Sequence, residues 1–489
     1  MSGFKSGADR GQIALLPERL DDYVGAENEV RVIDAFVDGL DLAALEVARA
    51  VPSRLGASSY DPRDLLKLYV YGYLNRVRSS RRLERECHRN VEVMWLMGRL
   101  APDHKTIANF RKVNARALKK VFREFTLLCG ELDLFGRELT FIDGTKIHAV
   151  NGKDRNFTVE RLKKLLPLIE ERIGEYLAEL DQQDRGEADG DSGKSLKEKL
   201  EGLKARKAKY EQYQEELKEG NERQLSLTDP ESRRMKTREG FGVCYNAQVA
   251  VDPKHHLIAA QDVTNEVTDR EQLAEMALAA KEALGVKELE VVADCGYHNA
   301  TKVKQCGEAK ITAYVPAVES SKNANQGLYT KLDFRYDPER DAYLCPNGEW
   351  LEFFTQSRDK GQEVQYYRNA QACRECPLRA QCTRSREEGR RIARRVDEAW
   401  AEDMEERVKA RPELQQQRKC VVEHPFGTMK RAMDFGYFLL KGLEKVRGEF
   451  SLMALSYNLR RVIGVLGVRT LLERLRERSR TRGRRLAAA

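Results

Sequence analysis

The segment from Glu138 to Lys146 reads ELTFIDGTK, a run of β-branched and aromatic residues that ends in a polar Asp-Gly-Thr-Lys stretch. This composition predicts a short buried strand with Asp143 at its carboxyl end. A second run, Leu289 to Ala293 (LEVVA), is followed directly by Asp294. The chain therefore has two predicted strands that each deliver a carboxylate, and the rest of the fold is interpreted outward from them.

The segments around these two runs alternate between strand and helix signals. Further strands are predicted at 242–251, 256–263 and 310–315, and helices over about 268–284 and from Asn299. The chain order is then strand, two hairpin strands, helix, strand, helix, strand. That order predicts an α/β core of the ribonuclease-H-like class, a mixed sheet with flanking helices.

The first block of the chain, from Glu27 to about Phe135, is predicted to be helical. Asp61 before Pro62 is a helix N-cap followed by proline at the first helical position, and Asp103 is a second N-cap. Polar and basic residues suited to DNA follow Asp103 on its helix: Lys105, Asn109 and Lys112. The pattern fits a helix-turn-helix-like DNA-binding module, with an ordinary helical bundle as the alternative.

Two insertions lengthen the predicted core. Residues 158–183 and 195–220 are rich in Leu, Glu and Lys at helical spacing, with a flexible turn predicted at 184–193. They predict an antiparallel helical hairpin inserted over 155–228. The second insertion, at 319–394, carries a group of cysteines.

The predicted domains are an N-terminal helical DNA-binding domain at 1–135, a catalytic domain at 136–468 and a basic C-terminal tail at 469–489. The tail holds eight Arg against two Glu between Arg469 and Arg485, although the whole chain has a net charge of only 86 − 78 = +8. Concentrated arginine is expected of a phosphate-binding surface, and a solvated charged face is the alternative.

The composition excludes membrane and secreted proteins. Charged residues make up 34% of the 489 positions. The longest aliphatic and glycine run, Val462 to Val468, is far shorter than the roughly 18 apolar residues that span a bilayer. The first 22 residues have no apolar core of a signal peptide. A cytoplasmic location is therefore expected.

Ten cysteines in a chain of this length do not form a disulfide framework. Six are scattered, and four are grouped as Cys345, Cys373, Cys376 and Cys382. Four thiols, two of them in a CxxC pair, suit a structural Zn²⁺ site in a reducing compartment. Reduced thiols packed without metal, and an iron–sulfur or redox role, are the alternatives.

Asp143, Asp294 and a later helical acid, Glu423, form the donor set that two Mg²⁺ (or Mn²⁺) ions need for phosphoryl transfer. The acids stand in three blocks: FIDGTK at 141–146, VADCGY at 292–297, and VEHPFG at 422–427 followed by Lys430. These blocks resemble, in order, the three catalytic blocks of bacterial insertion-sequence DDE transposases. The resemblance covers about residues 15–468. It implies that the three acids are catalytic metal ligands and that the N-terminal helices bind DNA.

The resemblance also implies basic contacts to the DNA backbone around Glu423. Lys430 and its neighbour Arg431 stand at and beside the expected basic position, seven residues after the acid. Arg418 is one residue further from Glu423 than the signature arginine, and Lys419 has the stricter spacing. Gln415, or Gln416 on the stricter spacing, replaces the expected Tyr. Near the first acid, Lys146 is a further candidate for phosphate contact, with a solvated lysine as the alternative.

The implied activity is hydrolysis at the terminal inverted repeats of the element, followed by attack of the 3′-OH on target DNA. Transposon-end and target DNA are the expected partners, with a homodimer in the synaptic complex and a location at the bacterial nucleoid. No nucleotide cofactor is expected, because no GxxxxGK[ST] loop is present. The alternatives are a catalytically inactive DNA-binding regulator and a ribonuclease-H-like nuclease without strand transfer.

Overall fold

The computed structural model describes residues 19–51, 59–183, 190–220, 224–317, 323–359, 362–385, 387–395 and 397–488. Residues 184–189 of the turn predicted at 184–193 lie outside the described residues. The chain divides into two compact units, Met1–Cys129 with Thr428–Ala489, and Gly130–Gly427. The domain boundaries expected from the sequence stay a prediction.

The second unit is built on a mixed six-stranded sheet. Five strands follow the order β4 (Arg233–Thr237), β5 (Gly240–Asp252), β1 (Leu139–His148), β7 (Leu289–Val292) and β8 (Ile311–Tyr314), and β6 (Leu257–Thr264) also pairs with β5. β1 runs antiparallel to β5 and parallel to β7, and β7 runs parallel to β8. The predicted mixed α/β class is confirmed.

β1 continues well past the apolar run that identified it. The strand was expected to end at Asp143, but it extends to His148 because Asp143 to His148 pair with Val249 to Cys244 of β5. The polar residues stay in the ladder since a long antiparallel partner satisfies their backbone groups. Asp143 therefore lies in the middle of β1, at the level where β7 ends.

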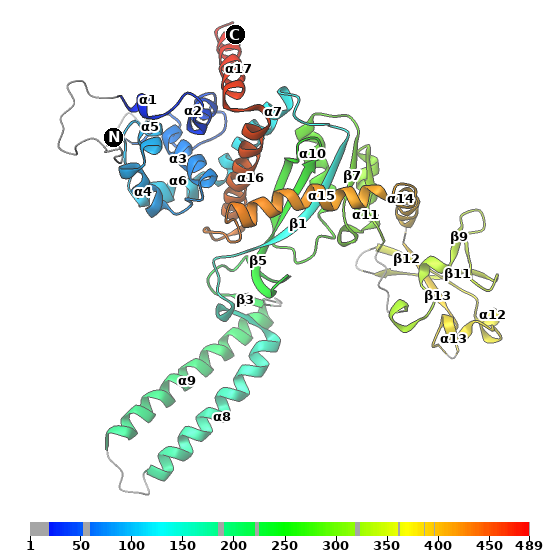
Figure 1. The fold of residues 1–489 in the computed structure, drawn as a ribbon. Coiled ribbons are helices and arrows are strands. Elements are labelled where there is room, and N and C mark those ends of the chain that lie inside the picture. Colours follow the sequence, from blue (N-terminus) through cyan, green and yellow to red (C-terminus); the bar gives the residue numbers. More distant parts are fainter. Residues whose placement is uncertain are drawn as a thin grey trace, which may run out of the picture. The chain divides into compact units, whose positions relative to one another are not determined.

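Four helices pack on this sheet. They are α10 (Leu273–Leu284), α11 (Ala300–Glu308), α14 (Glu398–Ala410) and α15 (Glu413–Gly427). α15 lies across β1 and contacts β5 and β7 as well (Figure 1). One expectation needs correction: α10 begins at Leu273 rather than near 268. The chain between α14 and α15 breaks at Arg411 and Pro412. A proline cannot continue the hydrogen bonding of the preceding helix, so the chain restarts after it.

The segment between β2 and β3 consists of two long helices. α8 (Val159–Gln183) and α9 (Gly190–Glu219) run side by side in Figure 1. A two-stranded ribbon, β2 (Asn156–Thr158) with β3 (Gln224–Ser226), closes their root. An apolar cluster fixes the root as well: Phe157, Leu162, Tyr213 and Leu217.

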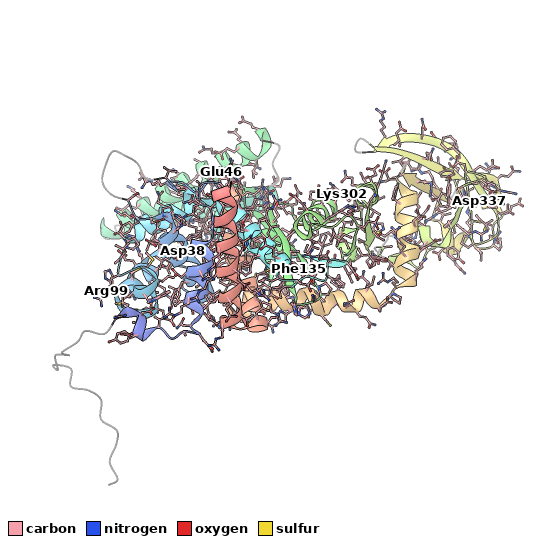
Figure 2. All side chains as sticks on the ribbon, turned by 90° about the horizontal axis from the view of Figure 1, so that it is seen from above. Asp38, Glu46, Arg99, Phe135, Lys302 and Asp337 are labelled. Atoms are coloured by element: carbon pink, nitrogen blue, oxygen red, sulfur yellow. The ribbon has the colours of Figure 1, made fainter. Side chains whose placement is uncertain are left out.

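The cysteine-bearing insertion forms a second sheet, which the sequence did not predict. Its antiparallel strands are β9 (Arg335–Asp337), β10 (Ala342–Leu344), β11 (Trp350–Asp359), β12 (Gln362–Arg368) and β13 (Arg391–Arg395). Two short helices, α12 (Ala370–Arg374) and α13 (Arg379–Cys382), lie between β12 and β13. Figure 2 labels Asp337 on β9. Tyr343 and Tyr367 are the largest side chains of its small core.

The first unit is all-helical. Its helices are α1 (Leu20–Tyr23), α2 (Glu29–Asp38), α3 (Pro62–Leu74), α4 (Ser80–Arg89), α5 (Val91–Leu96), α6 (His104–Val113), most of α7 (Ala115–Glu131), α16 (Leu443–Leu466) and α17 (Val468–Ala488). Both predicted caps form: Asp61 accepts from Arg63 N, and Asp103 accepts from the backbone N–H groups of Lys105 and Thr106. Within the described residues, no helix is both long and apolar enough to cross a bilayer.

A buried ionic cluster joins the two chain segments of this unit. Glu449 of α16 is fully buried and accepts hydrogen bonds from the backbone N–H groups of Leu439 and Leu440 and from the Tyr73 hydroxyl. Arg111 lies 3.8 Å from Glu449 and donates to Tyr73 at 2.8 Å. Arg111 is only 5% exposed, and the Glu449 carboxylate balances its charge.

Candidate active site

Asp143 and Asp294 are brought to matching positions on neighbouring strands. Phe141 of β1 pairs with Val292 of β7 in parallel register, and each acid lies two residues further on. Asp294 caps the short helix Cys295–Tyr297, where its carboxylate accepts from Gly296 N at 2.8 Å. The two sequence blocks, 151 positions apart, thus meet at one edge of the sheet.

Burial of Asp143 raises the free energy of its ionised carboxylate. Burial raises the pKa of this carboxyl to about 6, and the negative charges of Asp294 and Asp269 act in the same direction. The Arg418 guanidinium, 3.2 Å from the Asp143 carboxylate, opposes that rise. The pKa rise therefore comes chiefly from burial of the carboxylate, a cost that a bound cation would offset.

α15 supplies that arginine and is held across the carboxyl ends of the parallel strands. Its Gln415 Nε2 lies 3.3 Å from the carbonyl oxygens of both Ala293 and Tyr314. One turn later, the Arg418 side chain is 11% exposed and donates to Asp143. Gln415 thus has an anchoring contact at the place where the signature would have a tyrosine.

Glu423, the third predicted acid, is exposed on α15. It follows Arg418 by five residues, which turns it by about 140° around the helix axis relative to that arginine. Lys419 is exposed too, and the ring of His424 lies 5.1 Å from the ring of His256, in the β5–β6 turn. In the described part of the chain, no group of three or more His, Cys, Asp or Glu residues is placed to hold a metal ion. The structure thus brings Asp143 and Asp294 together without completing a three-acid cluster.

A fourth acid, Asp269, stands beside the first two, and sequence reasoning missed it. Its Oδ1 accepts hydrogen bonds from Lys146 Nζ (3.2 Å), Asn246 Nδ2 (2.6 Å) and Gln248 Nε2 (2.7 Å). The Gln248 carbonyl in turn accepts from the buried Tyr297 hydroxyl. This network connects Lys146 of the first block to Tyr297 of the second, so the two blocks share one set of hydrogen bonds.

The glycines beside the acids keep space for this network. A Cβ at Gly144 would lie 2.3 Å from Gln248 Nε2 and 2.8 Å from Asp269 Oδ1. A Cβ at Gly296 would lie 2.9 Å from Asp294 Oδ1. Side chains at these two positions would therefore displace the groups that surround the acids.

The sequence did carry a signal for Asp269. Asn246 and Gln248 are polar positions in the otherwise apolar β5, and both are fully buried. Buried amides need hydrogen-bond partners, so they predict a polar cluster at this face of the sheet. Asp269 was missed because a helix was expected to begin near 268 and to include it. In the structure, Asp269 lies in the turn before α10.

An open cavity of about 800 Å³ adjoins the acids. Its walls include Lys146, Asp269, Gly296 and Lys331. Three basic side chains (Lys146, Arg270 and Lys331) and two acids (Asp269 and Glu405) thus face a space large enough for part of a polynucleotide backbone.

Two family comparisons bear on this arrangement. Residues 344–463 match the family described as "Transposase DDE domain", and residues 18–113 match "Transposase domain (DUF772)". The resemblance to DDE transposases is confirmed. The DDE-domain match includes Glu423, and Asp143 and Asp294 precede it.

A piggyBac transposase synaptic complex with hairpin DNA aligns with a TM-score of 0.31 and 9% identity, over 93% of this chain and 80% of that chain. No curated protein matches the chain.

The remaining candidate DNA contacts lie in the first unit of the chain. Lys105, Asn109 and Lys112 are exposed along α6, inside the matched DUF772 region. Lys430 and Arg431 lie in a π-helical segment, Thr428–Ala432, that follows α15 in the chain. The acids belong to the second unit.

The four grouped cysteines lie together in the smaller sheet. Cys345 and Cys382 pack on the same apolar core. Burial raises the pKa of the Cys382 thiol to about 11, against the opposing charge of Arg390, and the other three cysteines add to the rise. The four sulfurs are thus within electrostatic reach of one another, although no metal-holding group is formed among the described residues.

Proposed function

We propose that this chain is a DDE transposase that cleaves DNA at the terminal inverted repeats of its element and joins the ends to target DNA. The observation that carries the proposal is the juxtaposition of Asp143 and Asp294 on parallel neighbouring strands, with α15 crossing above them. The strand order supports a ribonuclease-H-like core: the antiparallel strands β4, β5 and β6 lie on one side of β1, and the parallel strands β7 and β8 lie on the other.

The donor set fits divalent metal. Carboxylate oxygens are the ligands that Mg²⁺ and Mn²⁺ prefer, and Asp143 is a buried carboxylate with Asp294 and Asp269 beside it. Asp143 and Asp294 would hold the ions, with Glu423 as the third ligand. When bound, two such ions lower the pKa of water and stabilise charge on the attacking and leaving oxygens.

The chain's own residues would bind and orient the DNA strand. Arg418, which contacts Asp143, would also contact a phosphate oxygen, and Lys146, fixed by Asp269, faces the cavity of about 800 Å³. Lys419, Lys430 and Arg431 would contact the backbone on either side of the cut. Hydrolysis breaks the P–O3′ bond and leaves a 3′-OH, which then attacks a target phosphorus and displaces a second 3′-oxygen.

We further propose that the protein works on DNA as a homodimer in the bacterial cytoplasm, at the nucleoid. Two transposon ends must be joined in one event, and two copies supply one site for each end. The small sheet would bind structural Zn²⁺ through its four cysteines, and its role would be to hold that lobe together.

A strand-transfer assay tests the proposal, with end DNA, Mg²⁺ and a target plasmid. Asp143→Asn, Asp294→Asn and Glu423→Gln should each abolish cleavage and joining while DNA binding persists. An active Glu423→Gln variant would remove that residue from the site. Cleavage without joined product in the wild type would favour the nuclease, and binding without cleavage would favour the inactive regulator.

A further inference from the structure

We infer that the root of the helical insertion binds the phosphate backbone of duplex DNA beside the cleavage site. The surface consists of Arg161, Lys164, Arg234, Lys236 and Phe241, and is called the root patch below. The inference rests on the proposed function, because it takes DNA as the ligand. It concerns none of the residues expected from the sequence to bind DNA.

The root patch surrounds a cavity of about 370 Å³. Arg161 and Lys164 line it from the first turns of α8, Arg234 from β4, and Phe241 from the start of β5. Three different elements therefore converge on a space that fits one sugar–phosphate unit.

The charges around the cavity favour an anion. Three of its nine lining residues are basic, and Glu160 is the single acid among them. Arg161 lies 3.6 Å from the fully exposed Asp154 and donates to the Asn156 carbonyl oxygen at 2.6 Å, which fixes the guanidinium at the cavity wall. A held guanidinium loses less conformational freedom when it binds a phosphate.

The tip of the β4–β5 hairpin adds an exposed aromatic ring. Phe241 is 52% exposed, and the Arg234 guanidinium lies 4.3 Å from its ring centre. Phe241 pairs directly with Lys236 across the hairpin, so ring and ammonium share one face. A stacked cation beside an open aromatic ring is a combination that nucleic-acid-binding surfaces use for phosphate and sugar.

The strand pairing connects the root patch to the acids. Asp143 pairs with Val249, and Phe241 precedes Val249 by eight residues along β5. At about 3.3 Å per residue, the patch lies roughly 26 Å from the acids along the strand. A duplex with its scissile phosphate at Asp143 would cover that distance with about eight base pairs.

Fluorescence anisotropy of the full chain with a fluorescein-labelled, mixed-sequence DNA duplex tests the inference across a salt series. The variant Lys164→Gln/Arg234→Gln should reduce the slope of log affinity against log salt by about 1.8, since each phosphate contact contributes about 0.9. Phe241→Ala should weaken binding at every salt concentration and leave the slope unchanged. The matched control is Lys287→Gln/Lys310→Gln, which removes two exposed charges at the amino ends of β7 and β8 and should leave the slope at the wild-type value.

The outcomes separate this inference from the proposed function. A wild-type slope in the double variant, with intact thermal unfolding, overturns the root patch and leaves the transposase proposal standing. No duplex binding by the wild type would overturn both. If the double variant changes sedimentation of the free protein but not DNA affinity, the patch is a contact between two copies of the chain and the inference is wrong.

Discussion

At the residue scale, the buried charge of Asp143 costs stability. Its folded-state pKa of about 6 lies above the value of about 3.9 for an exposed Asp, so the native state binds its proton more tightly than the unfolded state does. Stability is then lost as the pH rises from about 4 to about 6, and the full cost is present above that range. The shift corresponds to about 3 kcal/mol.

Asp143→Asn should therefore raise the melting temperature at neutral pH, because the amide has no charge to bury. The gain should disappear below about pH 4, where the wild-type carboxyl is protonated. Differential scanning fluorimetry of both proteins over this pH range measures the effect. Added Mg²⁺ should stabilise the wild type and leave Asp143→Asn unchanged, and an equal response of the two proteins would contradict a metal at Asp143.

Asp269 is the residue whose role is most open to test. Asp269→Asn keeps an acceptor for the amides of Asn246 and Gln248 but removes the ion pair that holds Lys146. Loss of a partner that orients an active-site group commonly costs about 10- to 100-fold in activity, and cleavage should fall within that range. Glu266→Gln, a neutralised exposed acid in the same loop, is the matched control. Cleavage at the wild-type rate in Asp269→Asn would make the network purely structural.

At the scale of elements, apolar runs predicted the core strands well and their ends poorly. LEVVA and ELTFI identified β7 and β1, but polar Gly144 to His148 remained in β1 because β5 pairs with them. The small sheet was missed for a related reason. Three of its strands, β9, β10 and β13, have only three to five residues, and the tyrosine core forms only when all five strands assemble.

The candidate site likewise has a part that local sequence signals predict and a part that depends on tertiary contacts. The two strand acids follow from local signals, and the parallel register places them together. The face that α15 presents depends on contacts such as Gln415 to Ala293, which no local pattern encodes. Arg418, rather than Glu423, consequently contacts Asp143.

The small sheet gives a prediction at this scale. Purified under reducing conditions, the protein should contain about one zinc per chain by inductively coupled plasma mass spectrometry. Cys373→Ser/Cys376→Ser should lose the zinc and lower the unfolding temperature of the lobe, because the closed thiolate site holds α12 and α13 to the sheet. Cys87→Ser, a buried cysteine of the first unit, should keep it. If the wild type contains no zinc and melts like the double variant, the four cysteines are reduced thiols packed without metal.

At the scale of the whole molecule, net charge is a poor guide to DNA binding, and the C-terminal segment shows why. The expected basic tail is the helix α17, and its Leu471, Leu472 and Leu475 are buried. α17 packs on α2 within the first unit, so its arginines are carried on a structured surface. Deleting the segment would expose apolar surface of that unit. A loss of DNA affinity could then come either from the missing arginines or from partial unfolding.

Charge substitution separates these two effects. Arg476 and Arg480 are exposed on α17, and Arg476→Gln/Arg480→Gln leaves its three buried leucines in place. If both arginines contact phosphates, the salt slope of duplex binding should fall by about 1.8 while the thermal unfolding curve stays the same. Arg474→Gln provides a comparison, because Arg474 lies 3.3 Å from Glu477 and its charge is already partly balanced. An unchanged slope in the double variant would show that the arginines of α17 form a solvated face and that phosphate binding resides elsewhere in the chain.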